Sequence, residues 1–277
     1  MKKLLSNSEI ERLELNLFLD TLCEVYGLDI RNNSQASLRR RLDALVKNYK
    51  KENISELIPL ILYNENFNDK VINHITIQYS NLFRDSSFFK KLTKKIFPKL
   101  KNFSHVNIWI AGCANGEEVY SLLILLKEAE ILEKVTLYAT DISKGALSNA
   151  KSGILQKGIE TQDIDNYNMA GGKASLSDYF VFAYSKFKLK EELLSHVVFK
   201  EHDLAQDEAF TSCELILCRN VMIYFNHELQ EKVVQLFNNS LVPHGYLGIG
   251  MQESLAFLES AKSYKELKRG ISIYEKN

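Results

Sequence analysis

Polar residues with useful chemistry follow several short apolar runs of this 277-residue sequence. One run leads into the segment 112–118, which contains two glycines and two glutamates, and later runs lead into Asp141, Asp203, Arg219 and Asn220. In an open α/β sheet, ligands bind at the carboxyl ends of the parallel strands, so these residues would share one site. A carboxylate that ends the second strand typically accepts hydrogen bonds from ribose hydroxyls, and Asp141 fits this task. The spacing therefore predicts a nucleoside-type binding site.

The first turn of this site separates one nucleoside ligand from another. Dinucleotide pockets use the pattern G-x-G-x-x-G, which lets a pyrophosphate approach backbone N–H groups. This turn instead has G-x-x-x-G between Gly112 and Gly116, followed at once by Glu117 and Glu118. Two carboxylates at the start of a helix suit its dipole, but they would repel a pyrophosphate and attract a cation. S-adenosylmethionine carries a nucleoside, a sulfonium and an ammonium without any phosphate, and it fits best. An NAD site and a purely structural turn are the alternatives.

Apolar periodicity predicts the elements that position these residues. Aromatic alternation near residues 179–189 predicts a small inserted strand or hairpin, and Ser143 and Gly153 are the expected caps of the helix between them. Because strands and helices alternate, the expected fold class is α/β with a mostly parallel, Rossmann-like sheet. Strands are predicted at 106–110, 135–139, 196–199, 215–217, 245–251 and 271–274, and helices at 117–127, 144–152, 229–236 and around 255–258.

Glycine usage marks a boundary before this sheet. Of the 12 glycines, only Gly27 lies in the first 111 residues, so that part of the chain has few places for tight turns. It is therefore predicted to be mostly helical. A polar and aromatic joint, residues 76–89, then leads into a further helix that Ser86 or Ser87 would cap and Pro98 would end.

The composition excludes several classes of protein. The formal net charge is zero, which gives no general attraction to nucleic acid or anionic lipid. The N-terminal apolar stretch is too short for a signal peptide and no run is long enough to span a bilayer, so we expect a cytoplasmic location. The four cysteines and six histidines are scattered without metal-ligand spacing, and no metal site is expected.

Three motifs, AGCANGEEVYS, ATDIS and ILCRNVMIYF, in this order and spacing, resemble the chemotaxis receptor methyltransferases of the CheR family. TIQYSNLFRD resembles the motif that precedes the sheet domain of that family. The resemblance covers nearly the whole chain and implies a helical domain (1–75) and a methyltransferase domain (76–277) with a small inserted β-subdomain (about 160–193). It also implies methyl transfer from S-adenosylmethionine to glutamate side chains on the cytoplasmic helices of chemoreceptors in chemotaxis adaptation, with S-adenosylhomocysteine as the product.

The resemblance also implies which residues contact the cofactor. Glu118 would hold the methionine ammonium, Asp141 the ribose, and Asp203 with Leu204 the adenine. The family usually has Asn at position 78, Thr at 80, Phe at 82, Pro at 119 and Asn at 203, so this chain departs from the pattern there. Gln78 keeps the amide of Asn but extends it by one methylene. Carried over by position, the full set of contacts is Gln78, Ser80, Arg84, Gly112, Glu118, Asp141, Asp203, Leu204, Arg219 and Asn220.

The implied methyl transfer depends little on proton transfer by groups of the protein. A glutamate with a pKa of about 4.3 is already ionised at neutral pH, so its methylation requires no general base. Arg84 is the catalytic candidate that would hold the substrate carboxylate, because a guanidinium matches two oxygens. The alternative for Arg84 is a structural salt bridge to Asp85 or Glu117. Tyr224, the second catalytic candidate, would line the methyl-transfer pocket, or it is a packed aromatic residue.

Arg39, Arg40 and Arg41 lie together on one predicted helix. They form either a solvated basic face or a docking surface, and the resemblance favours docking to the acidic helices of chemoreceptors. We expect a monomer that neither binds nucleic acid nor inserts into a membrane. Two further hypotheses are a degenerate cofactor-binding regulator that docks on receptors without methylating them, and a methyltransferase that acts on a different signalling protein.

Overall fold

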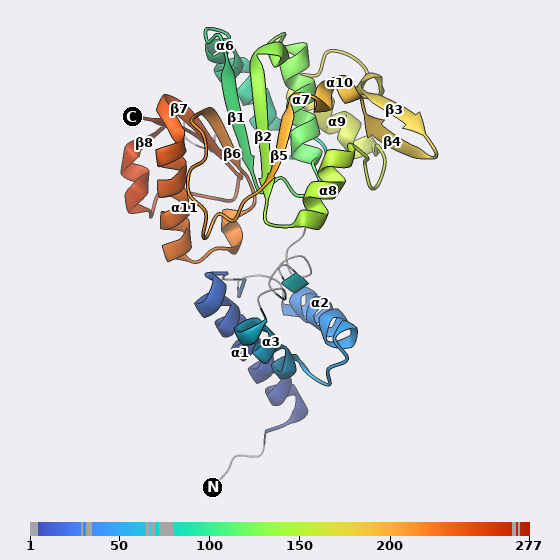
Figure 1. Ribbon diagram of the computed structural model, residues 1–277, viewed down its shortest axis with the longest axis vertical. Coiled ribbons are helices and arrows are strands. Elements are labelled where there is room, and N and C mark those ends of the chain that lie inside the picture. The colour runs from blue at the N-terminus through green and yellow to red at the C-terminus, as the bar shows by residue number, and fades with distance from the viewer. Residues whose placement is uncertain are drawn as a thin grey trace. The chain divides into compact units, whose positions relative to one another are not determined.

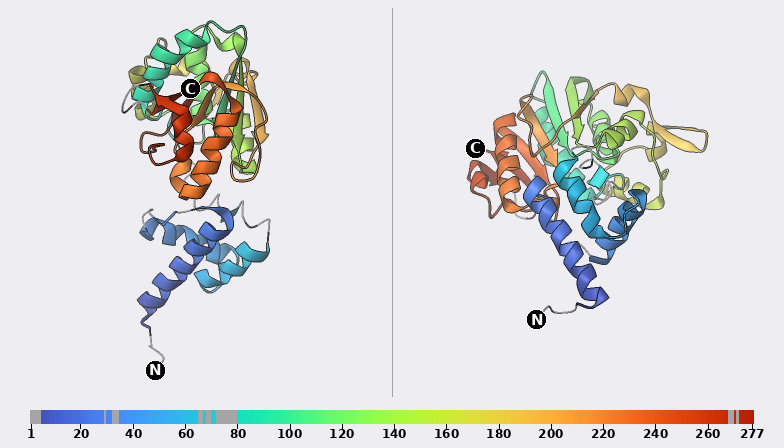
Figure 2. Two further views of the ribbon diagram at one scale, coloured as in Figure 1. Left: turned by 90° about the vertical axis from the view of Figure 1, so that its left-hand side faces the viewer. Right: turned by 60° about the horizontal axis from the view of Figure 1, so that its bottom comes forward.

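The computed structural model describes residues 5–28, 30–31, 35–64, 67, 70–71, 80–267, 270 and 272–277. The chain divides into two compact units, drawn in Figures 1 and 2. The first unit comprises Met1–Ile77 and Ile223–Gln230, and the second comprises Gln78–Met222 and Glu231–Asn277. The domain boundary predicted at residues 75 and 76 lies outside the described residues. No helix among the described residues is long and apolar enough to cross a membrane.

The first unit is built from helices, as its few glycines predict. Helix α1 begins at a capping box between Ser6 and Glu9 and ends at Gly27, which adopts the left-handed conformation. Its buried face includes Phe18 and Leu22, which belong to a core shared with the other helices of this unit. The elements are α1 (Asn7–Tyr26), α2 (Gln35–Asn48), the 3-10 helix η1 (Ile54–Leu57) and α3 (Ile58–Tyr63).

The second unit is organised around a seven-stranded sheet with the order β5-β2-β1-β6-β7-β9-β8. The strands from β5 to β7 pair in parallel, whereas β9 pairs antiparallel with both β7 and β8. The α/β fold class and the mostly parallel sheet are confirmed, and Figure 1 shows the parallel strands side by side. Their bounds are β1 (Val106–Ala111), β2 (Val135–Asp141), β5 (Val197–Glu201), β6 (Cys213–Cys218), β7 (Leu241–Ile249), β8 (Tyr264–Glu266) and β9 (Ile273–Lys276).

Helices pack on both faces of this sheet because the central strands are apolar on both sides. Ile108 and Ile110 of β1 contribute to a core that also contains the apolar side of α7. Trp109 points to the opposite face, where its ring lies 5.4 Å from that of Phe237 in α11. The helices of this unit are α5 (Ser86–Lys91), α6 (Phe97–Leu100), α7 (Glu117–Glu128), α8 (Lys144–Ser152), α9 (Thr161–Ala170), α10 (Glu191–Leu194) and the larger part of α11 (His227–Ser240), whose first residues belong to the first unit.

An antiparallel hairpin lies in the segment where aromatic alternation predicted one. Strand β3 (Phe180–Ala183) pairs with β4 (Lys186–Leu189) in a separate two-stranded sheet. Tyr184 and Ser185 form its turn with positive φ angles of 51° and 60°. In Figure 1 the hairpin projects away from the main sheet beside α9 and α10.

Helix α8 confirms the predicted caps, since the Ser143 side chain accepts a hydrogen bond from Ala146 N and Gly153 ends the helix. Two other predictions about helix ends were wrong. Helix α5 is capped by Asp85, which has a φ of 58° and makes no side-chain capping bond, and Ser86 is already the first helical residue. Pro98 does not end the helical run, which passes through a π-helical turn, Leu92–Ile96, into α6. Proline is tolerated there because it occupies the first turn of a new helical segment.

The helix predicted around residues 255–258 is absent. The segment forms turns, and a 3-10 helix, Glu259–Ser263, follows it. Leu255 and Leu258 are buried all the same, so their spacing reflects the core and not a helix. Backbone N–H groups in this region are bound by glutamate side chains, which replaces the hydrogen bonding that a helix would supply.

Candidate functional site

The order in which the chain adds strands to the sheet reverses between β1 and β6, which are neighbours although four other strands separate them in sequence. Such a switch point is where open α/β sheets bind ligands. Here the turn after β1 is joined to the end of β2, because the N–H groups of Gly112 and Cys113 both donate to Thr140 O at 2.8 Å. The predicted site residues of these two strands therefore lie together.

Asp141 organises the turn through its carboxylate. Its Oδ2 accepts a hydrogen bond from Ala114 N at 2.8 Å, and its Oδ1 accepts one from Ser143 N at 2.9 Å. Burial raises the pKa of Asp141, and the backbone hydrogen bonds act in the opposite direction. The carboxylate thus stands at the end of β2, where the sequence predicts a ribose-binding group.

Two glycines in the turn allow neighbouring side chains to pack closely against its backbone. Gly112 has a φ of 82°, and a Cβ atom added to it would lie 2.5 Å from Val221 Cγ2. Gly116 has a φ of 100°, and its added Cβ would lie 2.8 Å from the hydroxyl of Tyr120. Larger residues would be strained at both positions by conformation and by contact. Val221, in the loop after β6, therefore packs directly against the first turn.

Two glutamates occupy the first turn of α7, and Glu117 is buried whereas Glu118 is half-buried. The Glu117 residue is 6% exposed, and burial raises its pKa to about 7, with Asp163 adding to the shift and Lys157 opposing it. Burial also raises the pKa of Glu118, against the attraction of Arg219 and Arg84. Among the described residues, Glu117 Oε2 and Glu118 Oε1 are buried without a hydrogen-bond partner. Two acceptor oxygens are thus available for a cationic ligand.

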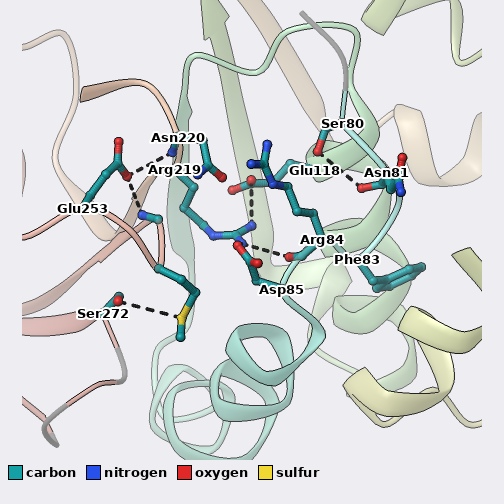
Figure 3. Close-up of polar contacts among 12 residues, drawn as sticks. Ser80, Asn81, Phe83, Arg84, Asp85, Glu118, Arg219, Asn220, Glu253 and Ser272 are labelled. Atoms are coloured by element: carbon teal, nitrogen blue, oxygen red, sulfur yellow. Dashed lines mark hydrogen bonds and ion pairs between the residues drawn. The ribbon is translucent and has the colours of Figure 1, made fainter. Parts of the chain in front are cut away.

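Arg219 lies at the centre of a buried charge network (Figure 3). Its Nη1 lies 2.9 Å from Glu118 Oε2, and its Nη2 donates to Arg84 O and to Asp85 Oδ2, both at 2.9 Å. The guanidinium also lies 4.3 Å from the ring centroid of Phe88. Because the Arg219 side chain is 1% exposed, it binds the protein's own groups and does not line an open pocket.

Arg84 differs from Arg219 because it is exposed. Its guanidinium makes no ion pair with any residue that the structure describes, so neither predicted salt bridge, to Asp85 or to Glu117, is present there. Asp85 pairs with Arg219 instead. In Figure 3 the Arg84 side chain extends toward Glu118, in agreement with its effect on the Glu118 pKa.

The joint before α5 is held against the sheet unit by backbone hydrogen bonds. Phe83 N donates to Ser121 Oγ at 2.8 Å, and Leu82 N donates to Asp163 Oδ1 at 2.9 Å. Ser80 is half-buried and its hydroxyl donates to Asn81 O at 3.4 Å. Gln78 lies outside the described residues.

The remaining predicted residues are distributed over both units. Asp203 follows β5, and its Oδ1 accepts a hydrogen bond from Ala205 N at 2.8 Å, while Leu204 beside it is buried. Tyr224 packs against the core of the helical unit. In that unit, Arg39 forms an ion pair of 2.8 Å with Glu11 of α1, and Arg40 is exposed.

Sequence reasoning missed Glu253, which follows β7. Its carboxylate accepts hydrogen bonds from the backbone N–H groups of Asn220 and Val221, each at 3.0 Å, and from Gly250 N. The Asn220 φ of 60° was also not foreseen. No local pattern could reveal the contacts of Glu253 with Asn220 and Val221, because they join segments more than thirty residues apart.

A small, partly open recess lies beside the first turn of α7. Three carboxylates and one lysine give it an acidic character. Its lining is formed by Ser80, Asn81, Leu82, Glu117, Leu155, Gln156, Lys157, Gly158, Glu160 and Asp163. Among the described residues, no three His, Cys, Asp or Glu side chains are grouped to hold a metal ion.

These features fit S-adenosylmethionine better than a dinucleotide. The orphaned oxygens of Glu117 and Glu118 match cationic groups, and they stand where a dinucleotide would need its pyrophosphate. The glycines of the turn let Val221 and Tyr120 pack closely against its backbone. Fold and site together define an α/β protein that binds a nucleoside-type cofactor at the switch point of its sheet.

Comparison with known proteins specifies the class further. Residues 78–271 match the family described as CheR methyltransferase, SAM binding domain. A candidate methyltransferase of Pseudomonas putida, Cher3, is 34% identical over 96% of this chain and 97% of its own length. A chemotaxis protein methyltransferase of Borreliella burgdorferi is 31% identical over 90% of each chain, and one of Vibrio cholerae is 28% identical over 91% of each.

The chain belongs to the CheR methyltransferase family. The resemblance inferred from the three motifs is therefore confirmed, and so is S-adenosylmethionine as the cofactor.

Proposed function

We propose that this protein transfers a methyl group from S-adenosylmethionine to glutamate carboxylates on the cytoplasmic helices of chemoreceptors, as part of chemotaxis adaptation. Relatives that align along most of the chain are named chemotaxis protein methyltransferases. The observation that carries the proposal is the exposed guanidinium of Arg84 beside the buried acidic turn of α7. This arrangement offers one group for an anionic substrate and others for a cationic cofactor.

Specific residues would hold the cofactor, which supplies an electrophilic methyl group when bound. Asp141 would accept hydrogen bonds from the ribose, and Asp203 with Leu204 would flank the adenine. The free oxygens of Glu118 and Glu117 would receive the methionine ammonium, and the recess beside Glu117 adds further negative charge nearby. Arg219 would act through Glu118, because its own side chain is enclosed.

Arg84 would orient the substrate carboxylate. Glutamate is ionised at neutral pH and is already nucleophilic, so the protein's task is to align it and to exclude water. A guanidinium binds a carboxylate through two parallel N–H···O bonds, which fixes both position and direction. The backbone carbonyl of Arg84 is held by Arg219 at 2.9 Å, which anchors the residue while its side chain remains available.

The helical unit would supply the docking surface. Arg39, Arg40 and Arg41 of α2 form a basic cluster that complements acidic receptor helices, although Arg39 is partly neutralised by Glu11. Attraction between exposed charges is weakened by salt, so receptor methylation should slow as ionic strength rises. Tyr224 belongs to the same unit and packs against its core, which supports the packed-aromatic alternative over a place in the methyl-transfer pocket. We propose that the protein does this as a cytoplasmic monomer.

The test is methylation of purified chemoreceptor cytoplasmic fragments with methyl-labelled cofactor. Base-labile methanol released from the receptor fraction is the expected result, since methyl esters hydrolyse in base. A parallel calorimetric titration with S-adenosylhomocysteine should give one site, weakened by Asp141→Ala. Cofactor binding without methyl transfer would favour the regulator hypothesis, and labelled methanol from another protein fraction would favour a different substrate. Either result would overturn the proposal.

A further inference from the structure

Glu253 occupies a position between the ends of two neighbouring strands (Figure 3). Its Oε2 accepts hydrogen bonds from Asn220 N at 3.0 Å and from Gly250 N at 2.5 Å, and its Oε1 accepts one from Val221 N at 3.0 Å. Asn220 and Val221 follow β6, whereas Gly250 follows β7. One carboxylate therefore ties together two loops at the carboxyl edge of the sheet, where the cofactor binds.

These hydrogen bonds support a strained backbone. Asn220 has a φ of 60°, in the left-handed region that costs a non-glycine residue free energy unless its surroundings enforce it. The left-handed conformation of Asn220 changes the direction of the chain between Arg219 and Val221. Arg219 extends to Glu118 at 2.9 Å, while Val221 packs against Gly112, leaving no room for a Cβ atom there.

We propose that Glu253 is a positioning residue for the cofactor site. Its hydrogen bonds fix the backbone of Asn220 and Val221. The position of Val221 in turn holds the first turn in place at Gly112, and the position of Asn220 sets the direction from which the Arg219 side chain reaches Glu118. The inference concerns the cofactor pocket alone and does not depend on which carboxylate is methylated. Nothing in the motifs that define the cofactor turn includes this residue.

The chemistry of the contact requires a carboxylate. Three N–H donors converge on two oxygens, and both oxygens must accept. A glutamine presents one acceptor and one NH₂ donor, so at least one backbone N–H would face another donor. A buried N–H group that loses its acceptor carries the full cost of desolvation, and the loop would rearrange to avoid it.

Glu253→Gln is the direct test, and Glu231→Gln is its matched control. Glu231 also accepts two backbone N–H bonds, from Glu259 and Ser260, but these lie in the 3-10 helix after the site. We expect Glu253→Gln to weaken S-adenosylhomocysteine binding by about tenfold or more, and Glu231→Gln to change it by less than about twofold. Calorimetry gives the affinities, and thermal melting reports the stability lost by each variant.

Amide hydrogen exchange separates positioning from general destabilisation. Glu253→Gln should accelerate exchange in the segments 219–222 and 112–116, while the β1 and β2 strands stay protected. If Glu253→Gln does not fold, Glu253→Asp provides the same comparison, because the shorter carboxylate cannot reach both loops. Unchanged product affinity in these variants, or equal losses in the Glu231 and Glu253 variants, would overturn the proposal.

Discussion

Arg219 and Glu118 form a buried ion pair, with 2.9 Å between Nη1 and Oε2, that joins the end of β6 to the first turn of α7. Asp85 binds the same guanidinium at 2.9 Å. The exposed fraction of the side chain is 1% for Arg219, 16% for Glu118 and 31% for Asp85. One cation therefore compensates two carboxylates in a poorly solvated site, where unpaired charges are costly.

Replacing Arg219 should destabilise the sheet unit strongly. Arg219→Met keeps much of the side-chain volume but leaves Glu118 and Asp85 without their cation, and breaking such a buried pair costs about 3–5 kcal/mol. Urea unfolding followed by the fluorescence of Trp109, the single tryptophan, measures the loss. The double variant Arg219→Met with Glu118→Gln should recover part of it, because only one uncompensated carboxylate remains. An equal loss in the double variant would contradict the ion-pair explanation.

Arg84 should affect turnover more than cofactor binding. Its guanidinium has no ion pair among the described residues, so Arg84→Ala would remove the proposed substrate contact while Glu118 keeps its ion pair with Arg219. We expect the turnover number on receptor fragments to fall by about a hundredfold, the size of effect that misplacing a reacting group produces. Affinity for S-adenosylhomocysteine should change by less than about threefold.

Arg84→Lys serves as the control for charge. Lysine keeps the positive charge but lacks the planar fork that binds two oxygens together, so it should restore only a minor part of the turnover. Equal losses of product affinity and turnover in Arg84→Ala would place Arg84 in the cofactor site and not on the substrate.

Much of the fold followed from local pattern. The strands β1, β2 and β6 are short, largely apolar and largely buried runs, and the glycines at 112 and 116 mark the turn that follows β1. The caps of α8 were also predictable, because a serine and a glycine adopt these roles through their own backbone and side chain. Such features depend on residues that are close in sequence.

What could not be predicted depends on residues far apart in the chain. The Asp85 side chain binds Arg219, 134 positions away, so Asp85 begins α5 without donating or accepting a capping bond through that side chain. The Glu253 side chain likewise binds a distant part of the chain, the loop after β6. The segment around Glu253 does not form the predicted helix. Hydrophobic spacing carries no information about which buried charges will meet.

Gly112 should not tolerate a side chain. In Gly112→Ala the new Cβ would lie 2.5 Å from Val221 Cγ2, at a φ of 82° that alanine adopts only with strain. We expect destabilisation of about 1–3 kcal/mol and weaker binding of S-adenosylhomocysteine, because the turn must move away from Val221. Adding Val221→Ala should restore part of the stability by removing the contact, while the backbone strain remains. If the second substitution restores nothing, the clash with Val221 is not the cause.

Glu117 should make the protein less stable as the pH rises toward neutrality. Burial raises its pKa in the folded protein to about 7 from an ordinary value of 4.5. Between these values the folded protein keeps the proton, whereas the unfolded chain has lost it. The contribution of Glu117 to the free energy of unfolding is therefore complete below pH 4.5 and is lost as the pH rises through about 7.

The size of this effect follows from the shift. Each pKa unit corresponds to about 1.4 kcal/mol, so Glu117 should remove about 3 kcal/mol between about pH 4.5 and 8. The glutamine of the Glu117→Gln variant cannot ionise, so the free energy of unfolding of this variant should fall less over the same pH range than that of the wild type. Other buried carboxylates, such as Asp141, titrate in both proteins, so the difference between wild type and variant reports Glu117 together with its coupling to Asp163. Urea unfolding at a series of pH values measures it, and parallel pH curves for the two proteins would show that Glu117 is ionised in the fold without cost.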